Sequence, residues 1–407
     1  MLALVGPVEP LDVVLHDAAG CVLAADVVAT ADVPLAAVAD CDGYALIVGP
    51  SGSEDGGRGR HAAALGTTTL PVVADLRPGP DRPQRLVPGQ AVRVGQGTPL
   101  PPGADAVVPV EATDRGTVSV TVPHSLVPGQ HVRAPGHDVR GGAVVLAAGT
   151  RLGARQLGLA AAVGRSRLVV HPSPRVVLLA VGDELVEPGA RAQTGPGQVY
   201  ESNRFALEAA VRDAGATPVV VPIVGDDRAA LRETVEDQLV RADVVVITGG
   251  LSELAHDTVK DVLPLVGDVR VDRVALTPGG RFGLGTLHGT SRDVPVLALP
   301  GEPVAATVAF EVFVRPALRT MAGRATIHRP SVPARVSSGW RSPDGLRQFV
   351  PATVVGAPGT GYAATVLADP SSPALWDVAR ADAFVVVPEA EQRVEAGRVL
   401  QCLVLDG

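Results

Sequence analysis

The clearest pattern in the chain is an alternation of short apolar runs and amphipathic stretches between residues 174 and 323. The apolar runs lie at 176–181, 218–224 and 243–248, and the first and last of them run into glycines. Continuous apolar runs of this length are typical of strands buried on both faces of a sheet. We therefore predict three buried strands here.

Helical spacing of apolar residues fills the stretches between these strands. Ser202 and Asn203 are residue types that begin helices, and Gly215 stands where a helix commonly ends. A second helix is predicted from about residue 227 to residue 242. Strands that alternate with helices of this length predict a doubly wound, mostly parallel α/β sheet domain with helices on both faces.

Three polar or glycine-rich turns follow strands of this predicted sheet. Asp183 and Glu184 follow the first strand, Thr248-Gly249-Gly250 the third, and Leu299-Pro300-Gly301 ends a later one. Ligands of parallel sheets bind beyond the carboxyl ends of the strands. The three turns are therefore expected to converge on one edge, which is the candidate site.

The rest of the chain has a different pattern. Residues 29–133 contain short Val-rich runs separated by Gly, Pro, Asp and Ser clusters, which predicts a small β-rich domain. From about residue 327 onward, short strands such as 383–387 and 399–405 recur with few helix signals. A second small β domain is expected there.

Composition narrows the class of protein. A chain of 407 residues predicts roughly two to four domains. The net charge of −8 disfavours nucleic acid as a partner. Three widely spaced cysteines, Cys21, Cys41 and Cys402, fit neither a disulfide framework nor a zinc site and indicate a cytoplasmic protein. We see no signal peptide and no apolar stretch long enough for a membrane span.

The Gly249-Gly250 exit suits an anionic ligand. Two glycines let the backbone approach a phosphate, and Ser252 is expected to cap a following helix whose N-terminus favours an anion. Asp257 and Lys260, three residues apart, are expected on one helical face. The plainer alternatives are a tight turn and a solvated ion pair, and both are common.

Carboxylates are the other candidate chemistry. Asp183 and Glu184 are positioned to hold Mg²⁺, which takes one or two carboxylates together with phosphate oxygens and water. Alternatively, the aspartate only caps a turn. Asp42, in the segment Asp40 to Ala45, reads equally well as an ordinary Asp-Gly turn. The histidines lack metal-ligand spacing, and no G-x-S-x-G motif supports a covalent hydrolase.

Motifs that are weak singly occur in a recognisable order. They are VLAADVV at 22–28, Asp-Gly-Tyr-Ala at 42–45, Pro-Gly-Ala-Asp at 102–105, GDEL at 182–185, YESNR at 200–204, TGGLS at 248–252 and LPGEPVAAT at 299–307. In this order they resemble the molybdopterin molybdenumtransferases, the bacterial MoeA and gephyrin E-domain type. The match spans about residues 10 to 407.

The resemblance implies four domains and a homodimer. The domains are a linker and dimerisation domain (1–28 with 134–172), a small β-rich domain (29–133), a molybdopterin-binding α/β domain (173–325) and a C-terminal β-barrel-like domain (326–407). The cleft is expected between the sheet domain of one subunit and the small β domain of the other. The implied reaction joins molybdate to adenylylated molybdopterin in the presence of Mg²⁺ and releases AMP. The molybdopterin adenylyltransferase is a possible partner.

The resemblance also implies roles for individual residues. Catalytic roles fall on Asp42, Glu184, Asp257 and Lys260; ligand binding on Thr248, Gly249, Gly250, Ser252, Ser202, Asn203, Pro300, Gly301 and Arg281; and metal binding on Asp183 and Glu184.

Several positions depart from the family's pattern. Its Lys-Pro-Gly-Lys-Pro segment reads Thr277-Pro278-Gly279-Gly280-Arg281, so two lysines are missing, although Arg281 is placed to replace one. Its Pro-Gly-Asn-Pro turn carries Glu302, which adds negative charge. At roughly 1.5 to 3 kcal/mol per charge-assisted contact, two lost lysines lower transition-state stabilisation about 10²- to 10⁴-fold.

These departures keep two alternatives open. One is a non-catalytic paralogue that binds, carries or scaffolds molybdopterin while another copy inserts the metal. The other is a nucleotide hydrolase of the competence-damage-inducible protein A type, which shares only the sheet domain. The Asp-Gly-Tyr-Ala segment at 42–45 and the β domains on both sides of the sheet argue against the hydrolase.

Overall fold

The computed structural model describes residues 1–48, 66–79, 84–189, 197–252, 257–367 and 369–405. It divides into two compact units. The first comprises Met1–Val13, Gly20–Ala24 and Val169–Gly407, and the second comprises Val14–Ala19 and Ala25–Leu168. The predicted division into four domains stays a prediction.

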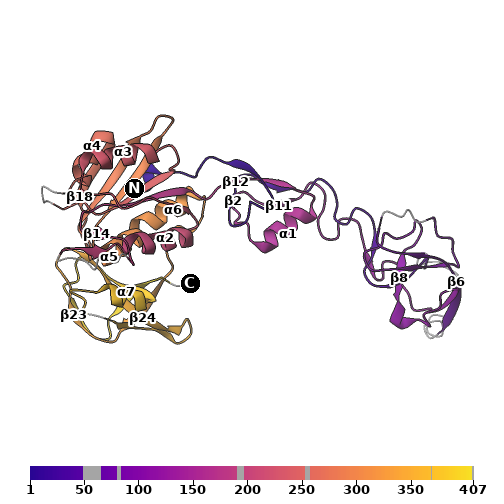
Figure 1. Ribbon diagram of the computed structural model, residues 1–407. Helices are drawn as coiled ribbons and strands as arrows, with labels where there is room; N and C mark the ends of the chain where they lie inside the picture. Colours follow the sequence, from indigo (N-terminus) through magenta and orange to yellow (C-terminus); the bar gives the residue numbers. More distant parts are fainter. Residues whose placement is uncertain (49–65, 80–83, 190–196, 253–256, 368, 406–407) are drawn as a thin grey trace. The chain divides into compact units, whose positions relative to one another are not determined.

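The first unit contains a six-stranded sheet with the order β16-β13-β17-β21-β20-β18 (Figure 1). The first four of these strands are parallel, and β20 and β18 are antiparallel to their neighbours. The strands are β13 (Arg175–Ala180), β16 (Thr217–Val220), β17 (Val244–Thr248), β18 (Gly267–Arg273), β20 (Arg281–His288) and β21 (Asp293–Leu299). The predicted mostly parallel sheet is confirmed.

Helices cover both faces of this sheet because its buried strands are apolar throughout. In β13, Val177 and Leu179 pack with α3 and α4 on one face, while Val176 and Leu178 pack with α2 and α6 on the other. The helices are α2 (Asn203–Ala214), α3 (Arg228–Gln238), α4 (Val259–Val266), α5 (Pro303–Ala309), the π-helix η4 (Phe310–Val314) and α6 (Arg315–Met321). The doubly wound arrangement is thus confirmed (Figure 1).

Two predicted boundaries extend too far. The strand predicted over 218–224 ends at Val220, two residues before Pro222, which has no amide hydrogen for a ladder. The helix predicted to reach residue 242 ends at Gln238. Leu239 is nevertheless buried in the same core, so the apolar spacing continues beyond the end of the helix.

The second unit is built around a five-stranded sheet with the order β8-β5-β7-β6-β9. Tyr44 is fully buried in it, and its hydroxyl donates a 2.9 Å hydrogen bond to the carbonyl oxygen of Gly116. The strands are β5 (Gly43–Leu46), β6 (Thr67–Leu76), β7 (Ala91–Val94), β8 (Ala106–Pro109) and β9 (Ser119–Pro123). The β-rich pattern seen in the sequence agrees with this sheet.

Shorter elements complete the region before residue 172. They are η1 (Leu2–Leu4), β1 (Leu11–Val14), β2 (Val22–Leu23), β3 (Val27–Val28), β4 (Val38–Ala39), η3 (Val110–Ala112), β10 (Val132–Arg133), β11 (Val144–Leu146), α1 (Ala154–Ala162) and β12 (Arg167–His171). Strands β1, β12 and β2 form one small sheet, while β3 pairs with β11 and β4 with β10.

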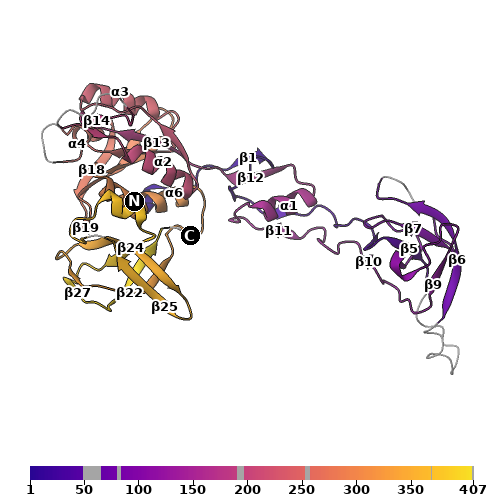
Figure 2. The same cartoon turned by 60° about the horizontal axis from the view of Figure 1, so that its bottom comes forward.

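The C-terminal region forms a closed barrel of five strands in the order β24-β25-β22-β28-β26, closed by pairing of β26 with β24 (Figure 2). The predicted β-barrel-like domain is confirmed. Strand β19, from the sheet region, pairs with β24 in parallel. The remaining elements are β14 (Leu185–Val186), β15 (Val199–Tyr200), β19 (Leu276–Thr277), β22 (Ser331–Val336), β23 (Trp340–Arg341), β24 (Arg347–Ala357), β25 (Gly361–Val366), α7 (Leu375–Arg380), β26 (Ala383–Val387), β27 (Arg393–Val394) and β28 (Val399–Val404).

Within the residues that the structure describes, no helix is both long and apolar enough to span a membrane.

Candidate functional site

A groove of about 680 Å³ lies at the carboxyl edge of the central sheet. It is lined by Glu184, Gly249, Gly250, Leu251, Ser252, Asp257, Arg273, Gly280, Arg281, Pro300, Gly301 and Glu302. The three turns predicted to converge do so, because parallel strands place their carboxyl ends along one edge.

The Gly249-Gly250 turn needs glycine at both positions. Their φ angles are 92° and 66°, and a Cβ on Gly249 would lie 2.2 Å from the carbonyl oxygen of Val181. The Gly249 amide donates to the carbonyl oxygen of Leu299 at 3.2 Å. The turn therefore brings two strand exits together. The Gly249 amide is already hydrogen bonded within the protein.

The segment after this turn differs from the prediction. Helix α4 begins at Val259, after the N-cap Thr258, so Ser252 does not cap α4 and Asp257 lies before the helix on whose face it was predicted. Instead, the Ser252 amide donates to the Asp257 carboxylate, and Lys260 Nζ donates to the Ser252 carbonyl oxygen at 2.7 Å. Both side chains thus hold the backbone of one residue, with 253–256 lying outside the described residues.

The Pro300-Gly301 turn is fixed from two sides. Asn203 Nδ2 donates to the Gly301 carbonyl oxygen at 2.8 Å. The two oxygens of Glu302 accept hydrogen bonds from the amides of Val304 at 3.0 Å and Ala305 at 2.7 Å. Glu302, which departs from the family pattern, therefore accepts the hydrogen bonds of the amides at the start of α5 with its own carboxylate.

The two predicted metal-binding carboxylates lie in different surroundings. Glu184 is exposed and lines the groove. Asp183 instead accepts a hydrogen bond from the Asp226 amide at 2.9 Å, and its own amide donates to the Asp226 carboxylate at 3.1 Å. The sequence reasoning missed Asp226, although it follows the neighbouring strand exit. No described group of three or more acidic, histidine or cysteine side chains is arranged to hold a metal.

Glu201 rather than Ser202 binds the start of α2. Its carboxylate accepts from the Arg204 amide at 2.7 Å, whereas Ser202 makes no side-chain capping bond. Burial raises the pKa of Glu201, and the amide and charge of Arg204 offset this only in part. Ser202 and Asn203 lie at the helix start as predicted, but the cap comes from the residue before them.

Six predicted residues do not line the groove: Asp42, Asp183, Ser202, Asn203, Thr248 and Lys260. Thr248 is 4% exposed, and its hydroxyl lies 3.5 Å from the carbonyl oxygen of Leu179. Asp42 belongs to the second unit, where its exposed carboxylate accepts from the Gln96 amide at 2.7 Å. Thr248 therefore supports the strand exit from behind, and Asp42 fixes a turn of its own unit.

Two arginines form the basic wall of the groove. Arg273 ends β18, Arg281 begins β20, and the two stand directly opposite each other in the antiparallel ladder. Only Arg281 was predicted. A signal for Arg273 is present in the sequence, because both arginines flank the turn that contains Pro278-Gly279-Gly280.

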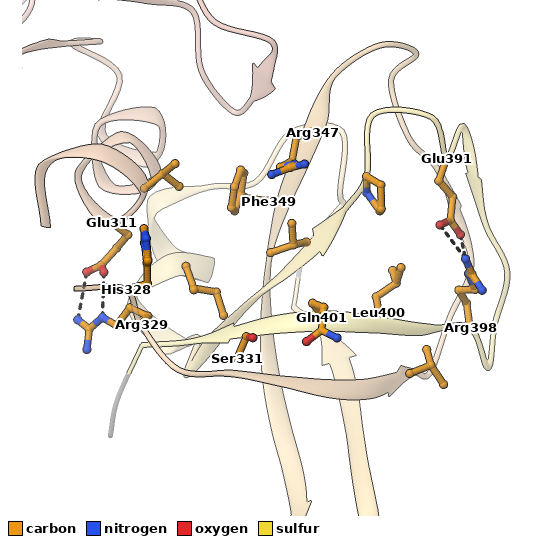
Figure 3. Close-up of a pocket in the computed structure, with 15 residues that line it drawn as sticks. Glu311, His328, Arg329, Ser331, Arg347, Phe349, Glu391, Arg398, Leu400 and Gln401 are labelled. Carbon is orange, nitrogen blue, oxygen red and sulfur yellow. Dashed lines mark hydrogen bonds and ion pairs between the residues drawn. The ribbon is translucent and has the colours of Figure 1, made fainter. Parts of the chain in front are cut away.

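A second groove of about 610 Å³ lies between η4 and the C-terminal barrel (Figure 3). Glu311 binds Arg329 at 2.9 and 3.1 Å, and Glu391 binds Arg398 at 2.9 and 3.2 Å. Figure 3 shows these ion pairs at opposite ends of the groove. Each arginine of this groove forms an ion pair with a glutamate, whereas the three predicted turns converge at the groove of the sheet edge, which is therefore the stronger candidate.

The fold and the edge groove define a multidomain α/β protein with a groove at the strand exits of its sheet. Residues 1–164 match the MoeA N-terminal region (domain I and II), 177–320 a probable molybdopterin binding domain and 333–405 the MoeA C-terminal region (domain IV). The chain belongs to the molybdopterin molybdenumtransferase family.

Relatives match along nearly the whole chain. Molybdopterin molybdenumtransferase 1 of Mycobacterium tuberculosis is 40% identical, with 98% of this chain and 95% of the relative covered. Molybdopterin molybdenumtransferase 2 of the same organism is 39% identical, with 97% and 94% covered. The solved MoeA structure from Pyrococcus horikosii gives a TM-score of 0.78 at 27% identity and covers 99% of this chain and 96% of that one.

Proposed function

We propose that this chain inserts molybdate into adenylylated molybdopterin and releases AMP, as a transferase of molybdenum cofactor biosynthesis. The observation that carries the proposal is the 39–40% identity to two molybdopterin molybdenumtransferases over almost their full lengths. The edge groove supports it, because glycine turns, carboxylates and guanidinium groups of the described chain line one cavity.

Each wall of the groove has a role in this proposal. Gly249, Gly250, Pro300 and Gly301 form a floor that a ligand approaches closely, and Ser252 adds a polar rim. Asn203 holds that floor from the start of α2, where Ser202 is the N-cap residue, and Thr248 supports it from the sheet. Asp257 and Lys260 are positioning residues, because each binds the backbone of Ser252.

Mg²⁺ is the proposed cofactor, and the carboxylates fit it. Glu184 presents an exposed carboxylate to the groove, and Asp183 lies next to it, hydrogen bonded to Asp226. One or two carboxylates together with phosphate oxygens are what Mg²⁺ takes. Bound there, it would offset charge on the phosphate oxygens during release of AMP. Glu184 orients the substrate in the groove that it lines together with the two arginines.

A cytoplasmic homodimer is part of the proposal. Asp42 lies in the unit that does not contain the groove, and by the family resemblance it acts on substrate in the groove of the partner subunit. The molybdopterin adenylyltransferase is the proposed supplier, because its product is this enzyme's substrate. Sedimentation of the wild type and of Asp42→Asn tests whether the protein is a dimer. Activity of mixed dimers of the two tests whether Asp42 acts in the groove of the partner subunit.

The test of the activity is direct. Purified protein is incubated with adenylylated molybdopterin, molybdate and Mg²⁺, and AMP and molybdenum cofactor are measured. We expect both products, and both should fall when Glu184 is replaced by Gln. Binding of the pterin without release of AMP would reject the enzymatic assignment.

A second candidate function is a carrier that binds molybdopterin without inserting metal. The specific observation that favours it is Thr277 and Gly280 in place of two lysines, with Glu302 adding a carboxylate to the groove. A second copy in the genome with the lysines intact would support a carrier. Loss of all molybdoenzyme activity on deletion of this gene alone would reject it.

A further inference from the structure

One wall of the edge groove is a loop that contains two adjacent glycines. The loop, residues 274–280, joins β18 to β20, and its Gly280 lines the groove. The Val274 amide donates to the Gly280 carbonyl oxygen at 3.2 Å, and the Leu276 amide donates to the Val274 carbonyl oxygen at 2.8 Å. Gly279 and Gly280 raise the entropy that is lost when the loop is ordered. Contacts that hold the loop from outside therefore matter for the shape of the groove.

The C-terminal barrel supplies such contacts. Strand β19, within the loop, pairs in parallel with the start of β24, so that Leu276 lies opposite Arg347 (Figure 2). The next pair along the two strands is Thr277 and Gln348. The Arg347 amide donates to the Ala275 carbonyl oxygen at 3.0 Å. Leu276 is 9% exposed and packs in one cluster with apolar side chains of the barrel. The position of the loop therefore depends on the position of the first residues of β24.

Gln348 is a buried polar residue at this junction. It is 1% exposed, and Phe349 and Val350, which follow it in β24, are buried and apolar. Its Oε1 accepts a 2.9 Å hydrogen bond from Trp340 Nε1, and its Nε2 donates to the Pro370 carbonyl oxygen at 2.6 Å. Trp340 belongs to β23, and Pro370 lies in the segment before α7. One side-chain amide thus joins β24 to two other segments.

The chemistry of this amide favours a role in positioning over one in filling space. A buried amide is costly unless both of its ends are hydrogen bonded, whereas an apolar side chain fills the same volume without partners. Two directional hydrogen bonds fix the start of β24, and a fully bonded buried network makes its surroundings rigid. The residue that is fixed in this way is the one opposite Thr277 of the loop.

We propose that Gln348 is a positioning residue that holds the loop 274–280 in the wall of the edge groove. The inference rests on the proposed function and gives the barrel a part in substrate binding. Gln348 acts through the backbones of β24 and β19, since its side chain is buried and does not line the groove. Without its two hydrogen bonds, the start of β24 and the loop paired with it open more often, so the groove binds substrate less tightly. The chemical step itself is unaffected.

Hydrogen exchange of the full chain measures the loop directly. Gln348→Met removes both hydrogen bonds and nearly keeps the length of the side chain. Val336→Ala is the matched control, because Val336 is 1% exposed in the barrel core and lies on β22, whose neighbours are β25 and β28. Both variants are expected to lower the midpoint of thermal unfolding. Only Gln348→Met should speed exchange of the Leu276 and Arg347 amides, by about tenfold relative to the control.

Release of AMP gives the second readout. For Gln348→Met, we expect KM for adenylylated molybdopterin to rise about tenfold and kcat to stay within about twofold of the wild type. Val336→Ala should leave both constants unchanged. Trp340→Phe, which removes the donor to Gln348 Oε1, should raise KM less, and adding it to Gln348→Met should have little further effect because the two side chains act together. Should Gln348→Met fail to fold, Trp340→Phe carries both measurements.

Three outcomes would contradict the proposal or its premise. If KM is unchanged in Gln348→Met, or if loop exchange rises as much in Val336→Ala, Gln348 only stabilises the fold, and the proposed function stands. A fall in kcat at constant KM would place the effect on the chemical step and overturn the proposal as well. If the wild type releases no AMP, the proposed function fails, while exchange of the Leu276 and Arg347 amides still decides whether Gln348 holds the loop.

Discussion

The two ends of the central sheet carry the same kinds of charged side chain and use them differently. At the amino end, where β13, β17 and β21 begin, Asp243 is 6% exposed. It accepts hydrogen bonds from Arg175 Nε at 3.1 Å, from the Arg175 amide at 2.7 Å and from Arg292. Its charge is therefore satisfied by the protein, and it ties together the starts of three neighbouring strands.

At the carboxyl end the charges face a groove. Glu184 and Glu302 are exposed there, and Arg273 and Arg281, directly opposed in the ladder of β18 and β20, line the same groove. Acidic and basic groups thus line one open groove instead of forming one buried cluster. The difference indicates that buried, mutually bonded charges support the fold, whereas charges that line an open groove face the space that a ligand would occupy.

The largest expected effect comes from removing the buried carboxylate at the amino end. Asp243→Ala leaves Arg175 and Arg292 without their shared acceptor, and we expect a loss of roughly 2 to 3 kcal/mol. In a domain of this size, that lowers the midpoint of thermal unfolding by about 5 to 10 °C. Calorimetry measures it. Asp237→Ala, on the exposed side of α3, is the control, and an equal drop in both variants would contradict the assignment.

The same carboxyl group predicts a pH dependence. Burial acts to raise the pKa of Asp243, but hydrogen bonds from Arg175 and Arg292 outweigh it and hold the pKa below its ordinary value. A depressed folded pKa stabilises the fold above the unfolded pKa of about 3.9, and that stability is lost as pH falls through the folded value. The stability difference between wild type and Asp243→Asn should therefore be constant from about pH 7 to 5 and shrink below about pH 4.

At the carboxyl end of the sheet, substitution of Glu302 is expected to have a smaller effect, which is on oxyanion affinity. Glu302→Asn removes a negative charge from the groove but keeps a residue type that caps helices well. We expect oxyanion affinity to rise roughly three- to tenfold at low salt and the gain to shrink as salt screens it. Glu302→Ala should raise affinity similarly and also lose about 1 kcal/mol of stability with the cap. Equal affinity of wild type and Glu302→Asn at low salt would show that this charge does not reach the anion.

The comparison also explains what the sequence could predict. The strands of the sheet were located to within a residue or two at 176–181 and 243–248 because both are apolar throughout. The convergence of their exits follows from topology, since parallel strands end on the same side. Local pattern and one general rule were therefore sufficient for the location of the groove.

The sequence could not show which side chains line the groove, because that depends on contacts between residues far apart in the chain. Arg273 enters the site through its register with Arg281, which is set by the pairing of β18 with β20. Ser252 was misread because α4 begins only at Val259, seven residues later. The capping by Glu302 likewise became visible only with the backbone of α5 in place.

The smallest expected effect is at Glu201, a buried acid at the otherwise exposed carboxyl end. It is 2% exposed, and its Oε2 is among the buried side-chain oxygens without a hydrogen bond in the described structure. Burial raises its pKa, so its ionised form costs stability at neutral pH, and the cost disappears below the unfolded pKa of about 4.3. Glu201→Gln should therefore be as stable as wild type or more stable at pH 7, by less than about 1 kcal/mol, and lose that advantage toward pH 4. Glu208→Gln, in the helix α2 that follows Glu201, is the control for the loss of one negative charge. A marked destabilisation by Glu201→Gln at pH 7 alone would mean that the charge itself holds Arg204, as Asp243 holds its arginines.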